Sequence, residues 1–351
     1  MRVGIFTDDF YPLTGGQGRH IKDLYNKLYK KKDFLIFSPN ENNLINHKTI
    51  FKFSRKFGKN LFLSFLINKN INEIIQENNI DIVHFHCGPG GLILIKKPSV
   101  KLICTVHHTY YQQQKYIPFQ KWKYLLYLLE RKMYHNADKI ITVSESTKEV
   151  LVKNYNVSPE KIVVIYNGVN FKIFKKIKSI KKIPNSLLYV GRLDKRKGID
   201  FLVKSIPLVK NEIPDIKLFI IGKGKSREKL EKFVEENNLE DNIKFLGFVP
   251  DDELPKWYNQ CKLTIVPSVF EGFGITVIES LACGTPVVGT NTDGIKDIIK
   301  DKNMLVKFGD KEDLAKKIVK LLENNQIKFN FKKNNYNLDR IAKETLEVYR
   351  I

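Results

Sequence analysis

Cysteine is scarce in this sequence, and the few cysteines are isolated from one another. Cys87, Cys104, Cys261 and Cys283 form no CxxC pair. This spacing excludes a disulfide framework and a zinc site built from cysteine pairs, and it is typical of small buried residues in a reducing compartment. We therefore expect four buried thiols.

Long hydrophobic runs are also missing. No apolar stretch approaches the roughly 20 residues that a membrane-spanning helix needs. The apolar residues of Arg2–Phe6 are soon followed by Asp8 and Asp9, a pattern typical of a strand and unlike a secretory signal. These absences predict a cytoplasmic protein, which could also lie peripherally on the inner face of the membrane.

Metal-binding carboxylates are not paired in the usual way. The sequence contains no strict Asp-x-Asp pair, which is a common device for holding Mg²⁺ on a nucleotide-sugar. Cations and backbone N–H groups would then have to neutralise the phosphates of such a ligand. We expect neither a metal ion nor a bound cofactor.

Negative charge is in short supply, since 38 Asp and Glu stand against 60 Lys and Arg, a net charge of +22. A basic excess suits a polyanion-binding protein, which would bind nucleic acid with a steep salt dependence. No recognisable nucleic-acid motif accompanies the charge, so nucleic acid is not an expected partner. The polyanion-binding interpretation stays open as an alternative.

Short apolar stretches alternate with helical patterns along the whole chain, which indicates α/β layers with parallel sheets. At 351 residues the chain is too long for one typical core and suits two domains. The expected strands are Arg2–Phe6, Leu35–Phe37, Ile82–Phe85, Leu102–Val106, Ile140–Val143 and Val163–Ile165 in the first half, and Leu187–Val190, Lys217–Ile221, Ile243–Leu246, Leu263–Val266, Pro286–Gly289 and Met304–Val306 in the second.

A lysine-rich segment separates the two sets of strands. Residues Asn170–Pro184 contain six lysines and no acid. We predict an N-terminal Rossmann-like domain over 1–169, a linker over 170–184, a C-terminal Rossmann-like domain over 185–335, and a C-terminal helix over 336–351 that packs back on the first domain. In two doubly wound domains that face each other, the loops after the strands would surround one cleft.

The most specific stretch is Glu271–Glu279, which follows a predicted strand. Its two terminal carboxylates bracket Gly272-Phe273-Gly274-Ile275. Glycines let backbone N–H groups approach an anion closely, and a helix N-terminus favours the same anion. A carboxylate beside that site can accept hydrogen bonds from a vicinal diol. The stretch thus predicts a nucleotide-sugar ligand, while acidic residues that merely favour a helix start are the alternative.

Two further loops offer groups for phosphate. Gly15 and Gly16 present bare backbone before a helix, although their spacing differs from the dinucleotide fingerprint. Arg192 follows the first strand of the second half and can fork onto phosphate oxygens, and Lys197 adds a compact charge. The alternatives are a flexible turn for the glycines and a solvated loop for the basic residues.

Two other strand ends carry weaker signals. Gly222 and Gly224 lack the third glycine of a Rossmann fingerprint, which argues against a nicotinamide dehydrogenase. His107 comes directly after a strand, so it would point into the cleft, although a lone histidine is usually structural.

Basic residues are interleaved with aromatic ones in Lys52–Ile75 and in Tyr116–Tyr134. Either segment could lie in a membrane interface, held by apolar burial and by attraction to anionic lipid. Helices that face the core and expose a basic back are the alternative.

Taken together, these motifs resemble the retaining GT-B glycosyltransferases of family 4, also called group 1, over nearly the whole chain. The resemblance implies two doubly wound Rossmann-like domains facing across a cleft, the N-terminal one on the acceptor side and the C-terminal one on the donor side. It also implies that Glu271 contacts the hydroxyls of the transferred sugar, that Glu279 takes the ribose, and that His107 lies near the developing charge.

The resemblance assigns the remaining site residues to the donor. Arg192, Lys197 and the backbone of Gly15, Gly16 and the Gly272, Phe273, Gly274, Ile275 region would hold the diphosphate. The loops with Gly222 and Val249 would flank the base.

The expected activity is transfer of a hexose from a UDP- or GDP-linked sugar to a lipid-linked or polysaccharide precursor in glycan biosynthesis. Positioning and stabilisation of the leaving diphosphate would supply most of the catalysis. A UDP-sugar epimerase of the same fold is one alternative, and the polyanion-binding protein is another. The expected partners are a nucleotide-sugar, a glycan or lipid-linked acceptor, and an anionic membrane surface.

Overall fold

The computed structural model describes residues 1–10, 16–28, 33–39, 47–49, 59–89, 91–116, 123–324 and 329–350. Gly15, Lys52, Lys56 and Trp122 lie outside these residues. The chain divides into two compact units: unit 1 comprises Met1–Gly168 and Asn334–Ile351, and unit 2 comprises Val169–Lys333.

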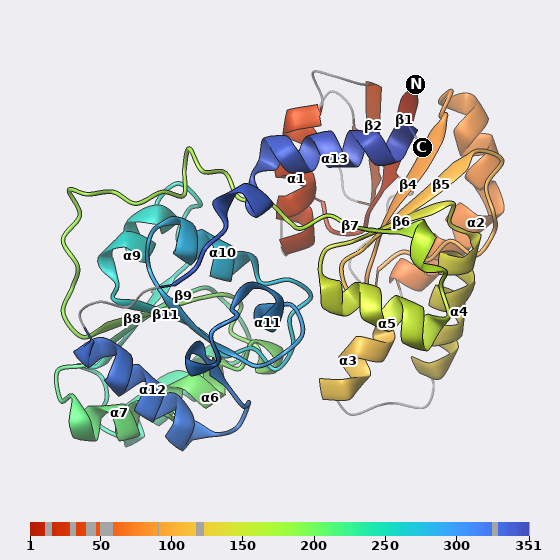
Figure 1. Cartoon of the computed structure of the whole chain (residues 1–351). Coiled ribbons are helices and arrows are strands. Elements are labelled where there is room, and N and C mark those ends of the chain that lie inside the picture. The colour runs from red at the N-terminus through yellow and green to blue at the C-terminus, as the bar shows by residue number, and fades with distance from the viewer. Residues whose placement is uncertain are drawn as a thin grey trace. The chain divides into compact units, whose positions relative to one another are not determined.

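Unit 1 is built on a parallel sheet of seven strands in the order β3-β2-β1-β4-β5-β6-β7 (Figure 1). The strands are β1 (Arg2–Phe6), β2 (Asp33–Ser38), β3 (His47–Thr49), β4 (Ile82–Cys87), β5 (Lys101–Val106), β6 (Lys139–Thr142) and β7 (Ile162–Val164). The helices are α1 (Gly16–Leu28), α2 (Lys59–Glu77), α3 (Tyr110–Tyr116), α4 (Lys123–Asn136), α5 (Glu145–Tyr155) and α13 (Leu338–Arg350).

Apolar side chains on both faces of this sheet explain its continuous apolar strands. All six residues of β4 are buried, as expected for a parallel strand covered by helices on both sides. Helix α2 presents Leu63, Ile67, Ile71 and Ile75 to the core, one residue per turn, and all four are buried. The opposite face of the sheet packs against α1 and α13.

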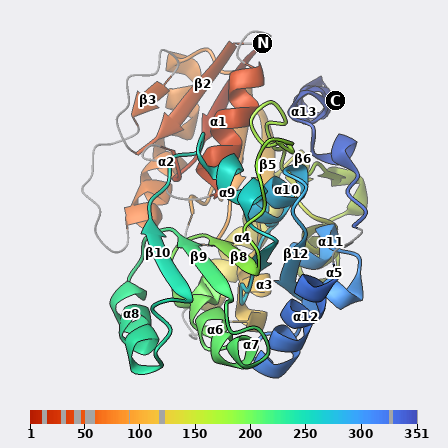
Figure 2. The same cartoon turned by 90° about the vertical axis from the view of Figure 1, so that its left-hand side faces the viewer.

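Unit 2 repeats the architecture with six parallel strands in the order β10-β9-β8-β11-β12-β13; Figure 2 shows β10, β9 and β8 side by side. The strands are β8 (Ser186–Val190), β9 (Lys217–Ile221), β10 (Ile243–Gly247), β11 (Leu263–Val266), β12 (Val287–Thr290) and β13 (Leu305–Val306). The helices are α6 (Ile199–Val203), α7 (Ile206–Glu212), α8 (Arg227–Glu236), α9 (Leu254–Gln260), α10 (Ile275–Ala282), α11 (Ile295–Ile298) and α12 (Lys311–Glu323).

The predicted α/β class with doubly wound parallel sheets is confirmed. Strand β3 was not predicted, because its three residues His47–Thr49 carry no apolar pattern. It is held by pairing, with His47 opposite Ile36 and with a 2.7 Å hydrogen bond between His47 Nε2 and Ser38 Oγ.

The strand order reverses once in each sheet. In unit 1 the reversal lies between β1 and β4, and in unit 2 it lies between β8 and β11. Connections on either side of such a point run to opposite faces of the sheet, which leaves a crevice at the carboxyl ends of the two strands. The loops after these strands are therefore the first places to look for a ligand site.

The segment expected as a linker is bonded to unit 2. The Ile177 N–H donates to Asn259 Oδ1 at 2.8 Å, and Lys182 Nζ donates to Cys261 O and Thr285 Oγ1, both at 2.6 Å. Helix α13 belongs to unit 1, where it packs on α1 and Lys27 pairs with Asp339 at 2.8 Å.

The predicted burial of the four cysteines is confirmed, and all are free thiols. Within the described ranges, no helix combines the length and the apolar character that crossing a bilayer requires.

Candidate functional site

The candidate site lies where the strand order of unit 2 reverses, between the loops after β8 and β11. The loop after β8 turns through η2 (Lys195–Lys197), which Asp194 caps by accepting from the Lys197 N–H at 3.0 Å. Gly198 then has φ +66°, and a Cβ there would lie 1.9 Å from the Pro267 carbonyl oxygen. Only glycine allows this approach, so Gly198 brings the two loops together.

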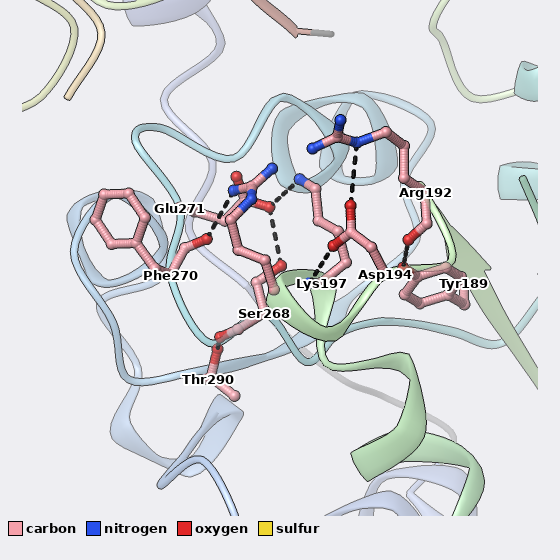
Figure 3. Close-up of polar contacts among 9 residues, drawn as sticks. Tyr189, Arg192, Asp194, Lys197, Ser268, Phe270, Glu271 and Thr290 are labelled. Carbon is pink, nitrogen blue, oxygen red and sulfur yellow. Dashed lines mark hydrogen bonds and ion pairs between the residues drawn. The ribbon is translucent and has the colours of Figure 1, made fainter. Parts of the chain in front are cut away.

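Lys197 and Glu271 meet as a result. The Lys197 ammonium donates to Glu271 Oε1, and Ser268 Oγ donates to the same oxygen at 2.9 Å. Figure 3 shows both side chains converging on Glu271. The side chains of Lys197 and Glu271 are 21% and 11% exposed, so the pair is shielded but can still reach a ligand.

The surroundings of Glu271 keep it ionised. Burial alone would raise its pKa, but the charges of Lys197 and Arg196 and the hydrogen bonds from Lys197 and Ser268 outweigh burial and lower the pKa to about 2. Arg196 also donates to the Phe270 carbonyl at 3.2 Å, which fixes the neighbouring backbone. Glu271 is therefore a hydrogen-bond acceptor at neutral pH and no proton donor.

Arg192 is an exposed cation of this loop. Its Nε lies 3.3 Å from Asp194 Oδ2, and its carbonyl accepts from the Tyr189 hydroxyl at 2.8 Å. Figure 3 shows the guanidinium directed toward Asp194, with its two terminal nitrogens outside that contact. A guanidinium anchored on one edge is suited to binding phosphate oxygens with the other.

The glycine loop after β11 leads into α10. Gly274 precedes the helix with φ +101°, and the first N–H groups of a helix have no partner within it. Phe273 anchors the loop by burial. Gly294, which directly precedes α11, supports the loop, because a Cβ there would lie 2.7 Å from the Glu271 carbonyl oxygen. The N-terminus of α10 thus lies beside Glu271, where an anion is favoured.

Glu279 lies in the second turn of α10 and is only 1% exposed. Its Oε2 accepts from the Tyr258 hydroxyl on α9 at 2.8 Å. The tyrosine fixes the carboxylate in one orientation, a suitable arrangement for recognising hydroxyl groups.

Gly222 and Val249 lie at the carboxyl ends of β9 and β10. Gly222 has φ +137°, and a Cβ there would lie 1.8 Å from the Gly191 carbonyl oxygen, so the loop after β9 touches the loop that carries Arg192. Val249 is half-buried beside Phe248, which is 69% exposed, with Lys223 Nζ 5.9 Å from the centre of its ring. An exposed ring of this kind could stack on a flat ligand group.

His107 and Gly16 belong to unit 1. Gly16 is the first residue of α1. His107 follows β5 and is almost fully buried, and its Nε2 lies 3.1 Å from Nδ1 of His86 on β4. Burial lowers the pKa of His107 well below its usual range, and nearby histidines lower it further. The ring is therefore neutral at pH 7.

The structure adds residues that the sequence analysis did not select. Ser268 holds Glu271, Tyr258 holds Glu279, and His86 contacts His107. Ser268 stands three residues before Glu271 in the same turn, which was a usable signal. Tyr258 and His86 come from other elements, and only the fold reveals their proximity.

Models of known protein families match both halves of the chain. Residues 170–338 match glycosyl transferases group 1, and residues 14–172 match glycosyltransferase family 4. An uncharacterized glycosyltransferase of Methanocaldococcus jannaschii is 32% identical over 91% of this chain and 88% of its own length. The alpha-monoglucosyldiacylglycerol synthase of Streptococcus pneumoniae is 26% identical over 92% and 78%, respectively.

Solved structures share the fold. Sucrose-phosphate synthase from Thermosynechococcus elongatus superposes with a TM-score of 0.80 at 20% identity, covering 100% of this chain and 98% of its own. Anabaena HepE in complex with UDP and glucose gives 0.76 at 18% identity, covering 100% and 99%. At these identities the likeness concerns the fold alone.

Proposed function

We propose a specific transfer reaction for this chain, which belongs to the glycosyltransferases of group 1 and family 4 and has the GT-B fold. It moves a hexose from a UDP- or GDP-linked sugar to a lipid-linked or glycan acceptor, and the anomeric configuration is retained. The observation that carries the proposal is the meeting of Lys197 and Glu271 beside Arg192 and the N-terminus of α10, where the strand order of unit 2 reverses.

This arrangement suits a diphosphate flanked by hydroxyls. Arg192, Lys197 and the N–H groups at Gly274–Ile275 supply positive charge to the phosphates, and the family resemblance assigns the backbone of Gly15 and Gly16 to the same role. Glu271 accepts from hydroxyls of the transferred sugar, and Glu279 accepts from the ribose. Anabaena HepE is solved with UDP and glucose, which supports a nucleotide-sugar as the ligand class here.

The reaction follows from these roles. The bond between the anomeric carbon and the diphosphate oxygen breaks as the acceptor oxygen attacks from the same face. The acceptor proton passes to the leaving phosphate oxygen. Arg192 and Lys197 stabilise the charge on the diphosphate, so the step uses no metal ion and no protein nucleophile. His107 is proposed to lie near the transferred sugar and its developing charge.

The acceptor side is proposed to be lipid-linked or a growing glycan. The pneumococcal relative is named for a glycolipid product. In this chain, Leu61, Phe62 and Phe65 on α2 are exposed, and the basic residues of Lys52–Lys59 precede them in sequence. An apolar patch next to cations is suited to an anionic membrane surface, and we assign peripheral membrane association on the cytoplasmic side to this patch.

The epimerase and polyanion-binding alternatives are less well supported. The pneumococcal relative is named as a synthase. A second relative, from Campylobacter jejuni, is named as an N-acetylgalactosaminyltransferase. It is 32% identical over 60% of this chain and 56% of its own length. Neither name describes an epimerase.

The test is thermal unfolding of the purified protein with UDP, GDP, ADP and their sugar conjugates, before and after chelation of metal ions. A ligand that binds the folded state raises the melting temperature by mass action. One nucleotide should give a clear shift that persists with chelator and is lost in Arg192→Ala. Product analysis with the matching donor then gives the anomeric configuration. No shift with any nucleotide, or an inverted product, would contradict the proposal.

A further inference from the structure

Three of the seven histidines in the sequence lie on one face of the sheet of unit 1, and a fourth, His20 on α1, packs against two of them. His84 and His86 are two residues apart on β4, and Thr105 and His107 are two residues apart at the end of β5, so all four side chains point to the same face. The pairing of His86 with Thr105 places the two strands in register. Helices α1 and α13 cover this face.

Hydrogen bonds join these side chains to two tyrosines. Tyr349 on α13 lies 2.8 Å from His84 Nδ1, while His84 Nε2 lies 2.7 Å from Thr105 Oγ1. The Tyr25 hydroxyl on α1 lies 3.1 Å from both His84 Nδ1 and His86 Nε2. His86 Nδ1 then lies 3.1 Å from His107 Nε2. The chain of contacts therefore runs from the C-terminal helix to the predicted site histidine.

Burial favours the uncharged form of every ring and hydroxyl in this series of hydrogen bonds. Burial lowers the pKa of His84 to about 3 and that of His86 well below its usual range, so each imidazole is neutral with one N–H and one acceptor nitrogen. Burial also raises the pKa of Tyr25 and of Tyr349, so both hydroxyls keep their protons. The direction in which each hydrogen bond is donated then decides the tautomer of each ring.

Only one direction of donation lets every hydrogen bond in this series use a contact of 3.1 Å or less. Tyr349 donates to His84 Nδ1, which leaves the Tyr25 proton to be donated to His86 Nε2. His86 then carries its proton on Nδ1 and donates it to His107 Nε2. In the reverse direction both hydroxyls need the single lone pair of His84 Nδ1, and one of them is left with the 3.4 Å contact between Tyr25 and Tyr349.

We propose that Tyr25, His86 and Tyr349 are positioning residues that hold His107 as its Nδ1–H tautomer, so that His107 offers a substrate an N–H donor and no base. A histidine with Nε2 occupied as an acceptor must carry its proton on Nδ1. His20 packs edge-to-face against the same ring, with 5.8 Å between ring centres. The orientation of His107 is thus fixed by packing on one side and by the hydrogen bonds on the other.

This proposal rests on the proposed function for the role of His107 but not for its tautomer. The tautomer is read by ¹⁵N NMR of protein labelled at its histidine rings, since protonated and unprotonated ring nitrogens differ in chemical shift. The His107 signals are those missing from the His107→Gln spectrum. We expect the Nδ1–H pattern in the unchanged protein, and an Nε2–H pattern would overturn the proposal.

Tyr349→Phe is the decisive variant, because Tyr349 stands at the opposite end of the series of hydrogen bonds from His107. It frees His84 Nδ1 to accept from Tyr25, which lets His86 reverse, so His107 should become a mixture of both tautomers. The value of kcat should fall about tenfold, the size of one lost orienting hydrogen bond, with KM for the donor changed less than about twofold. Tyr25→Phe should give the same pattern if Tyr349→Phe folds poorly.

Tyr155→Phe is the matched control. It also removes a buried tyrosine hydroxyl of unit 1, one that donates to Glu130 at 2.6 Å, and it should leave the His107 tautomer and kcat unchanged. An unchanged tautomer in both Tyr349→Phe and Tyr25→Phe would overturn the proposal, and so would a changed tautomer with unchanged kcat. If the unchanged protein neither binds a nucleotide nor transfers a sugar, the proposed function fails, while the NMR result still decides the tautomer.

Discussion

Lys197 and Glu271 form a shielded ion pair across 74 residues of sequence, joined by the close approach of Gly198 to Pro267. Among the residues that the structure describes, no second ion pair involves Lys197 or Glu271. Ser268 donates to the same carboxylate oxygen, so the carboxylate is held from two loops.

Removing the cation should leave Glu271 poorly compensated. Breaking a partly buried pair on one side costs about 2–3 kcal/mol of folding stability, which urea unfolding of Lys197→Ala would measure. The thermal shift given by the nucleotide should also disappear. Lys195→Ala is the control, because Lys195 is an exposed lysine on the same turn. Equal effects of the two substitutions would contradict a special role for Lys197.

Glu279 provides a test of ribose recognition that does not depend on catalysis. The nucleotide that stabilises the protein should bind about tenfold more tightly than its 2′-deoxy form, because one charged hydrogen bond is lost with the hydroxyl. In Glu279→Ala the two ligands should bind alike. Calorimetry gives both affinities, and a variant that still discriminates between them would exclude Glu279 as the ribose ligand. Tyr258→Phe serves as a control for displacement of the carboxylate.

The sheets could be predicted because each strand is a short apolar run that needs burial on both faces. Strand β3 could not, since His47–Thr49 is polar and is held by its pairing with β2. Helix α10 and its glycine loop were predictable because glycine, helix start and carboxylates follow one another in sequence.

The pairings within the site depend on distances that no local pattern contains. Glycine at 198 is visible in the sequence, but its partner Pro267 is defined only by the adjacency of β8 and β11. The alternation of His84 and His86 does indicate a shared face of a strand. Their link to Tyr349 requires helix α13 to lie on that face, and a terminal helix can pack in many places.

Stability should decrease as the solution becomes acidic, because buried histidines resist protonation. Burial lowers the pKa of His20 from 6.5 to about 4, so the unfolded chain binds this proton at a higher pH than the folded one. The stability that His20 contributes is complete above pH 6.5 and is lost as the pH falls from 6.5 to 4, by up to ~3 kcal/mol. Urea unfolding across this range should show a shallower loss in His20→Leu than in the unchanged protein.

The control for this experiment is Leu24→Ala. Leu24 is also buried on α1 but carries no titratable group, so this variant should lose stability without a change in slope. His84 and His86 add to the same slope in both proteins. Parallel curves for His20→Leu and the unchanged protein would show that His20 takes up its proton at the same pH in the folded and unfolded states, which would contradict the prediction.

The apolar patch on α2 gives the last prediction. Leu61, Phe62 and Phe65 are 57%, 47% and 64% exposed, although burying one such side chain is worth ~1.5–3 kcal/mol. The double variant Leu61→Ser with Phe65→Ser should weaken binding to anionic vesicles at least about tenfold. Replacing Lys52, Lys56 and Lys59 by Glu should weaken it further at low salt, because attraction to anionic lipid is electrostatic.

The matched control is Phe308→Ser, which removes an exposed aromatic ring of unit 2. Flotation with neutral and anionic vesicles separates the two contributions: the serine variants lose binding to both, whereas the glutamate variants lose only the preference for anionic lipid. Nucleotide binding should stay intact in the serine and glutamate variants of unit 1, since Arg192, Lys197, Glu271 and Glu279 belong to unit 2. Vesicle binding that survives both sets of changes would exclude α2 as the membrane contact and move the search to the exposed face of α4, where Tyr124, Leu125 and Leu128 lie.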